Sequence, residues 1–181
     1  HEVMKVVDLG FCTDGDWVAK HPDRLVWLPQ GFDERQQPVV TEKKGPSILF
    51  TGIGKGGGTQ RESFVAEMQD RYGSEFIHYV KGLHGDKLAR AVAEAKIVVA
   101  PDSPVTDHYW SNRVYNVLGM GGFLLHPYSD GITRQYRPME CITYQDRQHL
   151  HLLIDYYLND NPRACEVVAN VGQQRTLEAH T

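Results

Sequence analysis

The chain has 181 residues, of which 41% are hydrophobic and 23% charged, and its formal net charge is -4. This composition is typical of a globular protein with one well-buried domain, or one domain and a fragment of another. The acidic balance and the lack of a basic run argue against a general nucleic-acid binder and against a membrane-surface binder. No apolar stretch approaches the roughly 20 residues that a membrane span needs.

The three cysteines, Cys12, Cys141 and Cys165, lie far apart and form no C-x-x-C pair. An odd and scattered set of this kind indicates reduced thiols, a cytoplasmic location and no zinc ribbon. The sequence opens at His1 with neither Met nor a signal-peptide pattern, so we expect a piece of a longer polypeptide.

The first 44 residues are β-rich. Val3 to Phe11 and Leu25 to Leu28 are runs of strand-forming residues, and turn-rich sequence separates them. Residues 36–46, rich in Pro, Gly and Lys, are typical of a linker. We therefore predict that residues 1–44 are the tail and linker of one domain and that residues 45–181 form a second domain.

From Ser47 onward, short apolar runs alternate with segments of helical periodicity. Alternation of this kind predicts an α/β fold, a Rossmann-like parallel sheet with helices on both faces and ligands at the carboxyl ends of the strands. The expected strands are 47–51, 75–80, 96–100, 122–126 and 140–144, and the expected helices are 59–72, 86–95, 111–118, 147–158 and 162–171.

A short helix at 111–118 is the first candidate for a phosphate site. Ser111 is the expected N-cap, which places Asn112, Arg113 and Asn116 near the helix N-terminus. Unpaired backbone N–H groups and the helix dipole attract an anion there, and a guanidinium beside them suits a phosphate. The alternative is a surface arginine on an ordinary helix.

A glycine-rich loop after the strand at 47–51 is the second candidate. Gly52, Gly54 and Gly56 let backbone N–H groups approach a phosphate, and Lys55 and Arg61 add positive charge. The spacing of Thr59 and Glu62 predicts a capping box for the next helix.

Two common nucleotide motifs fit this loop poorly. Gly52, Gly54 and Gly57 satisfy G-x-G-x-x-G, but the second strand lacks the acidic residue that a dinucleotide fold needs at its end. A P-loop requires Ser or Thr after the lysine, and the chain has Gly56 there.

Several other polar residues have two interpretations. Asp14-Gly15-Asp16 is a D-x-D, typical of manganese sites, but Asp-Gly is also a common turn pair, which we favour. His84 follows the second strand and could flank a nucleobase, and Asp130 follows the central strand and could meet sugar hydroxyls; either could equally be a loop residue without such a role. We expect no metal ligands among His149, His151 and His180, which lack metal spacing and are expected at the surface.

The order and spacing of several short motifs resemble those of the C-terminal, donor-binding half of GT-B glycosyltransferases, and most closely those of the CgeB-type glycosyltransferase-like proteins. These motifs extend over nearly the whole chain. The motifs are Trp27 to Asp33, Leu49 to Gly52, Asn112 to Leu125, Ile142 to Asp146, Leu150 to Leu158 and Gly172 to Thr181.

The resemblance implies sugar transfer from a nucleotide-sugar to an unidentified acceptor, with a companion N-terminal domain on the acceptor side. It implies that the leaving diphosphate is stabilised without a metal, by Lys55, Arg61 and Arg113 with two helix N-termini, and that no separate cofactor is needed. Asp107 and His108 lie where the family places an acidic residue and are the catalytic candidates.

One residue departs from the family pattern. Asn116 stands where the family carries a glutamate that accepts hydrogen bonds from the donor's ribose. A neutral amide makes weaker bonds than a carboxylate. Besides the transferase, a nucleotide- or glycan-binding module without turnover and a nucleotide-sugar epimerase therefore stay open as alternatives.

Overall fold

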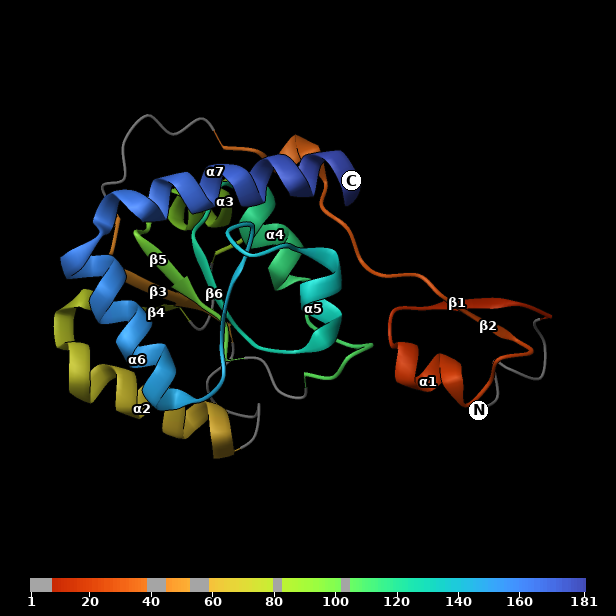
Figure 1. Ribbon diagram of the computed structural model, residues 1–181. Helices are drawn as coiled ribbons and strands as arrows, with labels where there is room; N and C mark the ends of the chain where they lie inside the picture. The colour runs from red at the N-terminus through yellow and green to blue at the C-terminus, as the bar shows by residue number, and fades with distance from the viewer. Residues whose placement is uncertain (1–7, 39–44, 53–58, 80–82, 102–104) are drawn as a thin grey trace.

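The structure is a computed structural model, and it describes residues 8–38, 45–52, 59–79, 83–101 and 105–181. Five parallel strands form the central sheet in the order β4-β3-β5-β6-β7 (Figure 1). This confirms the predicted Rossmann-like class, since strands paired in parallel need crossover connections, which are usually helices. The strands are β3 (Ile48–Thr51), β4 (Phe76–Tyr79), β5 (Ile97–Val99), β6 (Leu124–Pro127) and β7 (Ile142–Tyr144).

Helices cover both faces of this sheet (Figure 1). Alternate strand side chains enter two cores: Leu49 and Val98 pack with α3 and α4, whereas Phe50 and Val99 pack with α2 and α6. α7 crosses the molecule and contributes to both cores. The helices are α2 (Thr59–Tyr72), α3 (Gly85–Glu94), α4 (Arg113–Gly119), α5 (Asp130–Gln135), α6 (Arg147–Asp155) and α7 (Pro162–Ala179).

Three helical segments differ from the prediction. α5 was not expected, because the Ser129-Asp130-Gly131 sequence also suits a turn; Ser129 caps this helix by accepting from the N–H of Ile132. α6 continues as a π-helical turn, Tyr156–Asp160. α7 runs on to Ala179 through Gly172, where a Cβ would collide with the Glu140 carbonyl oxygen, so the glycine allows close packing rather than ending the helix.

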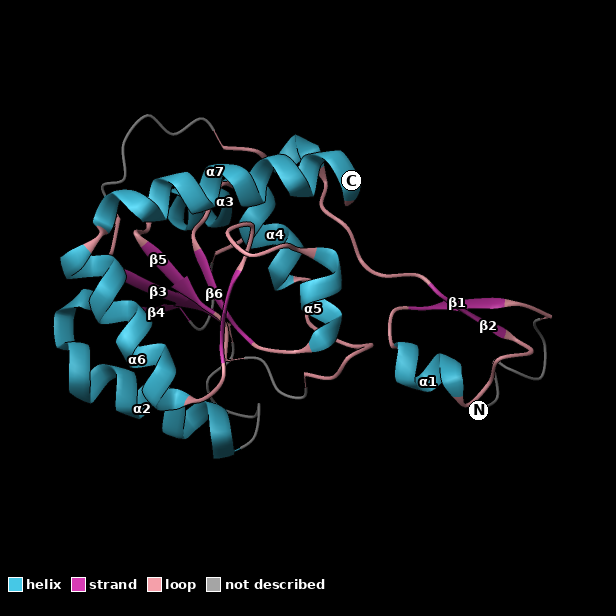
Figure 2. Cartoon of the chain, viewed as in Figure 1, coloured by secondary structure: helices cyan, strands magenta, loops and turns pink. Residues whose placement is uncertain are grey.

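The N-terminal segment is a small parallel β-α-β unit that lies to one side of the main body (Figure 2). Its helix was not predicted: Asp14 is the N-cap and accepts from the N–H of Trp17, so the Asp-Gly pair starts a helix and not only a turn. A 3-10 turn, Glu34–Gln36, follows. The unit consists of β1 (Gly10–Cys12), α1 (Gly15–Ala19) and β2 (Leu25–Trp27).

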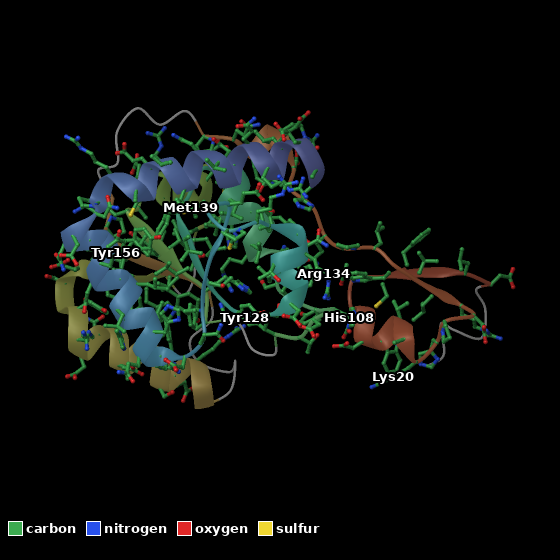
Figure 3. The ribbon with its side chains drawn as sticks, in the orientation of Figure 1. Lys20, His108, Tyr128, Arg134, Met139 and Tyr156 are labelled. Carbon is green, nitrogen blue, oxygen red and sulfur yellow. The ribbon has the colours of Figure 1, made fainter. Side chains whose placement is uncertain are left out.

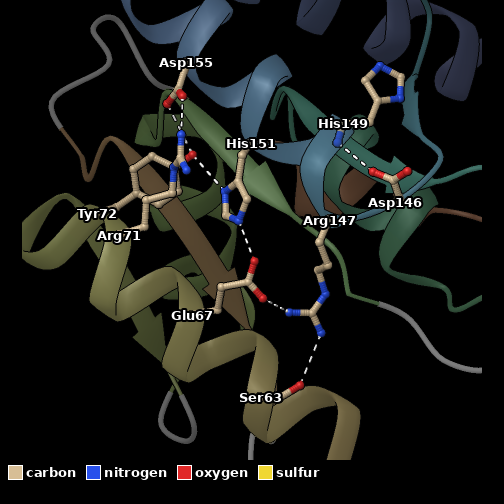
Figure 4. A network of polar contacts seen from close by, with 9 residues as sticks. All are labelled: Ser63, Glu67, Arg71, Tyr72, Asp146, Arg147, His149, His151 and Asp155. Carbon is tan, nitrogen blue, oxygen red and sulfur yellow. Dashed lines mark hydrogen bonds and ion pairs between the residues drawn. The ribbon is translucent and has the colours of Figure 1, made fainter.

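A polar network joins α2 to α6 on the face away from α4 (Figure 4). His151 is buried there: its Nε2 lies 2.6 Å from Glu67 Oε1 and its Nδ1 lies 3.0 Å from the Tyr72 hydroxyl. Arg147 pairs with the other oxygen of Glu67. The prediction of a surface histidine was therefore wrong at position 151, because helical periodicity alone does not reveal a carboxylate on the facing helix.

No helix in the described ranges is long and apolar enough to cross a lipid bilayer. Within the same ranges, no disulfide joins any of the three cysteines.

Candidate functional site

A cavity of about 160 Å³ opens beside the carboxyl end of β3, between α3 and α4. Leu88 and Val92 of α3 and Val117 of α4 form its apolar wall, together with Met120. Its polar lining residues are Thr51, Asn112, Arg113 and Asn116. Apolar walls with a few polar groups at one end are typical of small-molecule sites.

Arg113 supplies the formal charge in this lining. It is the first residue of α4, it is half-buried, and its guanidinium lies over the ring of Phe50 at 5.5 Å from the centroid. A cation over an aromatic face is attracted by the ring quadrupole. The buried ring of Phe50 therefore orients the guanidinium at the end of β3.

Gly52 makes room for this arrangement. Its φ of +153° lies in the region that favours glycine, and a Cβ there would come within 3.1 Å of Arg113 Nη2 and of the Phe50 ring. Its backbone is fixed from β4: its N–H donates to the Tyr79 carbonyl, and its carbonyl lies 2.8 Å from His78 Nε2. The first glycine of the predicted loop thus supports Arg113 through its lack of a side chain.

The start of α4 differs from the prediction. Asn112 and not Ser111 precedes the helix, and the Asn112 side chain makes no capping bond. The Ser111 hydroxyl accepts from the N–H of Arg113 at 3.2 Å. Because one of the first N–H groups is already bonded, the positive potential at this helix end comes chiefly from the Arg113 side chain.

Asn112, which precedes α4, and Asn116 within it are four residues apart, so they share one face and both line the cavity. The described lining contains no carboxylate. The described part of the lining therefore combines one cation with neutral amides, a set that suits an anionic ligand carrying uncharged polar groups.

The other residues of the predicted phosphate loop are described only in part. Gly54, Lys55 and Gly56 lie outside the described residues. α2 begins at Thr59 itself, so Thr59 is not the residue before the helix as the capping box required. Arg61 lies in the first turn of α2, and its buried Nε has no hydrogen-bond partner among the described residues.

His84 is exposed and occupies the N-cap position of α3. Asp86 lies in the first turn of the same helix. Because residues four apart share a helix face, His84 lies one turn beyond Leu88, which lines the cavity.

A second group of polar residues lies after β5 and β6. Asp107 Oδ1 accepts from the backbone N–H of Asp130 at 2.9 Å, and the Asp107 carbonyl accepts from Arg134 Nη2 at 3.1 Å (His108 and Arg134 are labelled in Figure 3). The Tyr128 hydroxyl donates to Asp130 Oδ1 at 2.5 Å, and this bond raises the pKa of Tyr128. Both carboxylates are therefore engaged in contacts that fix the start of α5.

His108 faces the N-terminal segment. Its Nδ1 lies 3.1 Å from Asp16 Oδ1, and its ring packs edge-on against Trp27 with centroids 5.9 Å apart. The structure thus divides the predicted residues into two groups. Asn112, Arg113 and Asn116 line the cavity, and Gly52 and Ser111 lie beside Arg113. Asp107 and Asp130 form a separate cluster, and His108 contacts the N-terminal segment.

The D-x-D motif also has partners of its own. Asp14 caps α1, and Asp16 accepts from Thr106 Oγ1 at 2.5 Å. That hydrogen bond is the main cause of the lowered pKa of Asp16. In the described ranges, no three His, Cys, Asp or Glu side chains gather as a metal site would require.

Sequence reasoning missed Phe50, Thr51 and Met120 as parts of the site. Phe50 and Thr51 belong to a strand whose apolar pattern predicts only a buried core strand. Met120 lies between the glycines that end α4, where the sequence predicts a turn and no binding residue. Leu88 and Val92, which have the helical spacing of core residues, face the cavity as well as the core.

The sequence profile of the family described as "Glycosyl transferase-like" matches residues 42–181. No curated protein matches the chain.

Solved structures of GT-B glycosyltransferases share the fold. Sucrose-phosphate synthase from Thermosynechococcus elongatus superposes with a TM-score of 0.69 at 12% identity, over 99% of this chain and 56% of that one. Anabaena HepE in complex with UDP-glucose gives 0.67 at 9% identity, over 96% and 60%. AviGT4, a glycosyltransferase involved in avilamycin A biosynthesis, gives 0.54 at 14% identity, over 93% and 62%. The chain therefore spans less than two thirds of each of these proteins.

Proposed function

Because the chain belongs to the glycosyl transferase-like family, we propose that it binds a nucleotide-sugar and forms the donor half of a site that transfers the sugar to an acceptor. We place it in the CgeB-type branch on the motifs described above. The observation that carries the proposal is the cavity beside β3, where Arg113 and two amides stand at one end of an apolar wall. HepE, which shares the fold, is known in complex with UDP-glucose.

In this proposal Arg113 stabilises the leaving diphosphate. Glycosyl transfer breaks the bond between the sugar's anomeric carbon and a phosphate oxygen, so negative charge grows on the diphosphate as it departs. A fixed cation lowers the barrier because it acts where that charge develops. Lys55, which follows β3 in the sequence, and Arg61, in the first turn of α2, are proposed to assist it without a metal.

The neutral part of the cavity holds the nucleoside. Leu88 and Val92 offer apolar surface to a base, and the Asn116 amide oxygen accepts from a ribose hydroxyl. A single hydrogen bond to a charged group contributes roughly 1.5–3 kcal/mol, and a neutral one about 1 kcal/mol. The diphosphate contact therefore dominates donor affinity.

The acceptor side belongs to a companion domain in this proposal. One face of the β1–β2 unit exposes four apolar side chains, and Phe11 is 66% exposed there. Parallel sheets are normally covered on both faces, so further polypeptide is expected over this one. The four side chains are Leu9, Phe11, Val26 and Leu28. We also retain a cytoplasmic location as part of the proposal, on the scattered cysteines.

The proposal is tested by calorimetric titration with UDP and UMP, each with and without EDTA. We expect UDP to bind more tightly than UMP, because only UDP presents a diphosphate to Arg113, and we expect EDTA to change neither value. Loss of UDP binding on adding EDTA would contradict the metal-free mechanism and would indicate Asp14 and Asp16 as metal ligands. Equal affinity for UDP and UMP would contradict the diphosphate assignment.

A second function, donor binding without turnover, is favoured by one observation. The cavity lining carries Asn116, and a neutral amide holds a ribose less firmly than a carboxylate. Release of UDP from UDP-glucose in the presence of sugar acceptors separates the two functions. Tight binding with no release for any donor and acceptor pair would favour the binding module.

A further inference from the structure

The N-terminal segment contacts the C-terminal end of α4 and also the residues that lead into its N-terminal end. At the far end, the Phe32 ring packs against Gly119, where any Cβ would collide with the ring. The N–H of Phe32 also donates to the His180 carbonyl at 2.7 Å, which anchors this contact to the end of α7. Residues from the predicted acceptor-side segment therefore touch the helix that carries Arg113.

At the near end, the contact is made by α1. The Asp16 carboxylate accepts from Thr106 Oγ1 with one oxygen and pairs with His108 Nδ1 through the other. The N–H of Gly15 donates to the His108 carbonyl at 2.9 Å, and a Cβ at Gly15 would lie 2.7 Å from the His108 Cβ. Backbone and side chain of α1 together hold the 106–108 turn.

That turn leads directly into α4, the helix that carries Arg113. The N–H of Thr106 donates to the Tyr109 carbonyl, which closes the turn. The buried Trp110 then packs edge-on against Trp27 at 6.0 Å and donates to the Tyr115 hydroxyl at 3.0 Å. Residues 106–111, which we call the strap, therefore connect Asp16 to the first turn of α4.

We propose that Asp16 is a positioning residue for the donor cavity: by holding Thr106 and His108 it fixes the strap, and the strap sets the position of Arg113. The proposal rests on the proposed function for the identity of the ligand. It gives the D-x-D motif a role that requires no metal. Under this proposal, donor affinity depends on the contact between the N-terminal segment and the strap.

The expected effect is moderate because the contact is exposed. The side chains of Asp16 and His108 are 44% and 50% exposed, and exposed pairs of this kind contribute little to global stability. Their removal should loosen the strap without unfolding the domain. We expect Asp16→Ala to weaken UDP binding by about threefold to tenfold, the range that corresponds to the loss of an exposed hydrogen bond.

The experiment compares Asp16→Ala with Asp23→Ala, which removes an equal charge from an exposed position of the same segment. UDP affinity is measured by calorimetry, and hydrogen exchange is followed over residues 105–119. Asp16→Ala should weaken binding and speed exchange of the strap and the first turn of α4, whereas Asp23→Ala should change neither. Asp16→Asn, which keeps an oxygen that accepts from Thr106, should keep part of the UDP affinity and part of the protection of the strap from exchange.

Unchanged exchange in Asp16→Ala overturns the proposal, and so does faster exchange with unchanged UDP affinity. If the wild-type chain does not bind UDP, the proposed function fails, and hydrogen exchange still decides whether Asp16 holds the strap. If Asp16→Ala loses the fold of the N-terminal unit, Thr106→Val removes the same hydrogen bond from the other partner and gives the same readouts.

Discussion

Two groups of polar residues lie at the carboxyl edge of one sheet, and their chemistry differs. The cavity beside β3 has Arg113 and two amides among its described lining residues and no carboxylate. The cluster after β5 and β6 is acidic, and its carboxylates already accept hydrogen bonds from the protein: Asp107 from the N–H of Asp130, and Asp130 from Tyr128.

The comparison shows that a place at the carboxyl edge of a parallel sheet does not by itself make a residue part of a binding site. The edge gathers polar side chains because the strands end there. The two groups differ in what surrounds them: Arg113 lines a cavity, whereas Asp107 and Asp130 bond to each other's chain segments. The following substitutions test whether the acidic cluster supports the fold while the cavity binds the donor.

The largest effect is expected at Gly131, within the acidic cluster. A Cβ at this position would collide with the Asp107 carbonyl oxygen and would come within 2.5 Å of the Trp110 ring. Gly131→Ala should lower the free energy of unfolding by about 3 kcal/mol, the upper range for overpacking, because a backbone atom cannot move aside as a side chain can. Urea titration of both proteins measures this difference in the free energy of unfolding. A change under about 0.5 kcal/mol, the size expected of ordinary surface substitutions, would mean that the cluster is not tightly packed.

Arg113→Ala should act on binding instead of folding. Loss of the guanidinium should weaken UDP binding by roughly 1.5–3 kcal/mol, the range for a hydrogen bond to a charged group. Calorimetry measures the affinity, and a thermal melt measures stability. Arg134→Ala is the matched control, because Arg134 donates to the Asp107 carbonyl in the other cluster. If Arg113→Ala binds normally and melts much earlier, Arg113 is structural.

The sequence predicted the sheet and the helix that carries Arg113, because both depend on local periodicity. Apolar runs such as Ile48 to Phe50 are buried as expected, and α4 begins two residues after Ser111. What the sequence could not provide was the partner of each polar group. His151 meets Glu67, 84 positions away in the chain, and Asp16 meets His108, 92 positions away.

The same limit explains the elements that were missed. α1 and α5 are short helices that begin at Ser or Asp next to Gly, a pattern that turns share. The cavity wall was missed in part because apolar residues that line a pocket, such as Leu88, have the same helical spacing as core residues. Packing against a second element decides between these outcomes.

Asp107 distinguishes a structural carboxylate from a catalytic one. Asp107→Ala removes the acceptor for the N–H of Asp130 and should lower the free energy of unfolding by about 1 kcal/mol, as the loss of a capping carboxylate does. Asp107→Asn keeps an accepting oxygen and should be nearly neutral. Chemical denaturation measures both. If Asp107→Asn abolishes sugar transfer while UDP still binds, the carboxylate takes part in the chemistry and the structural interpretation is wrong.

The smallest effect is expected at Asn116, within the cavity. If the donor's ribose reaches α4, Asn116→Glu replaces a neutral acceptor with a charged one and should tighten UDP binding by about 1 kcal/mol, since a bond is strengthened and not created. Inorganic pyrophosphate, which has no hydroxyl to donate, should gain nothing. Both ligands are compared by calorimetry on the same preparations.

A competing effect can be separated within the same experiment. A carboxylate at position 116 lies one turn from Arg113 on the cavity face, and it can pair with the guanidinium and draw it away from the diphosphate. That pairing would weaken UDP and pyrophosphate equally. No change for either ligand would place Asn116 outside the donor site, and the ribose assignment would then be wrong.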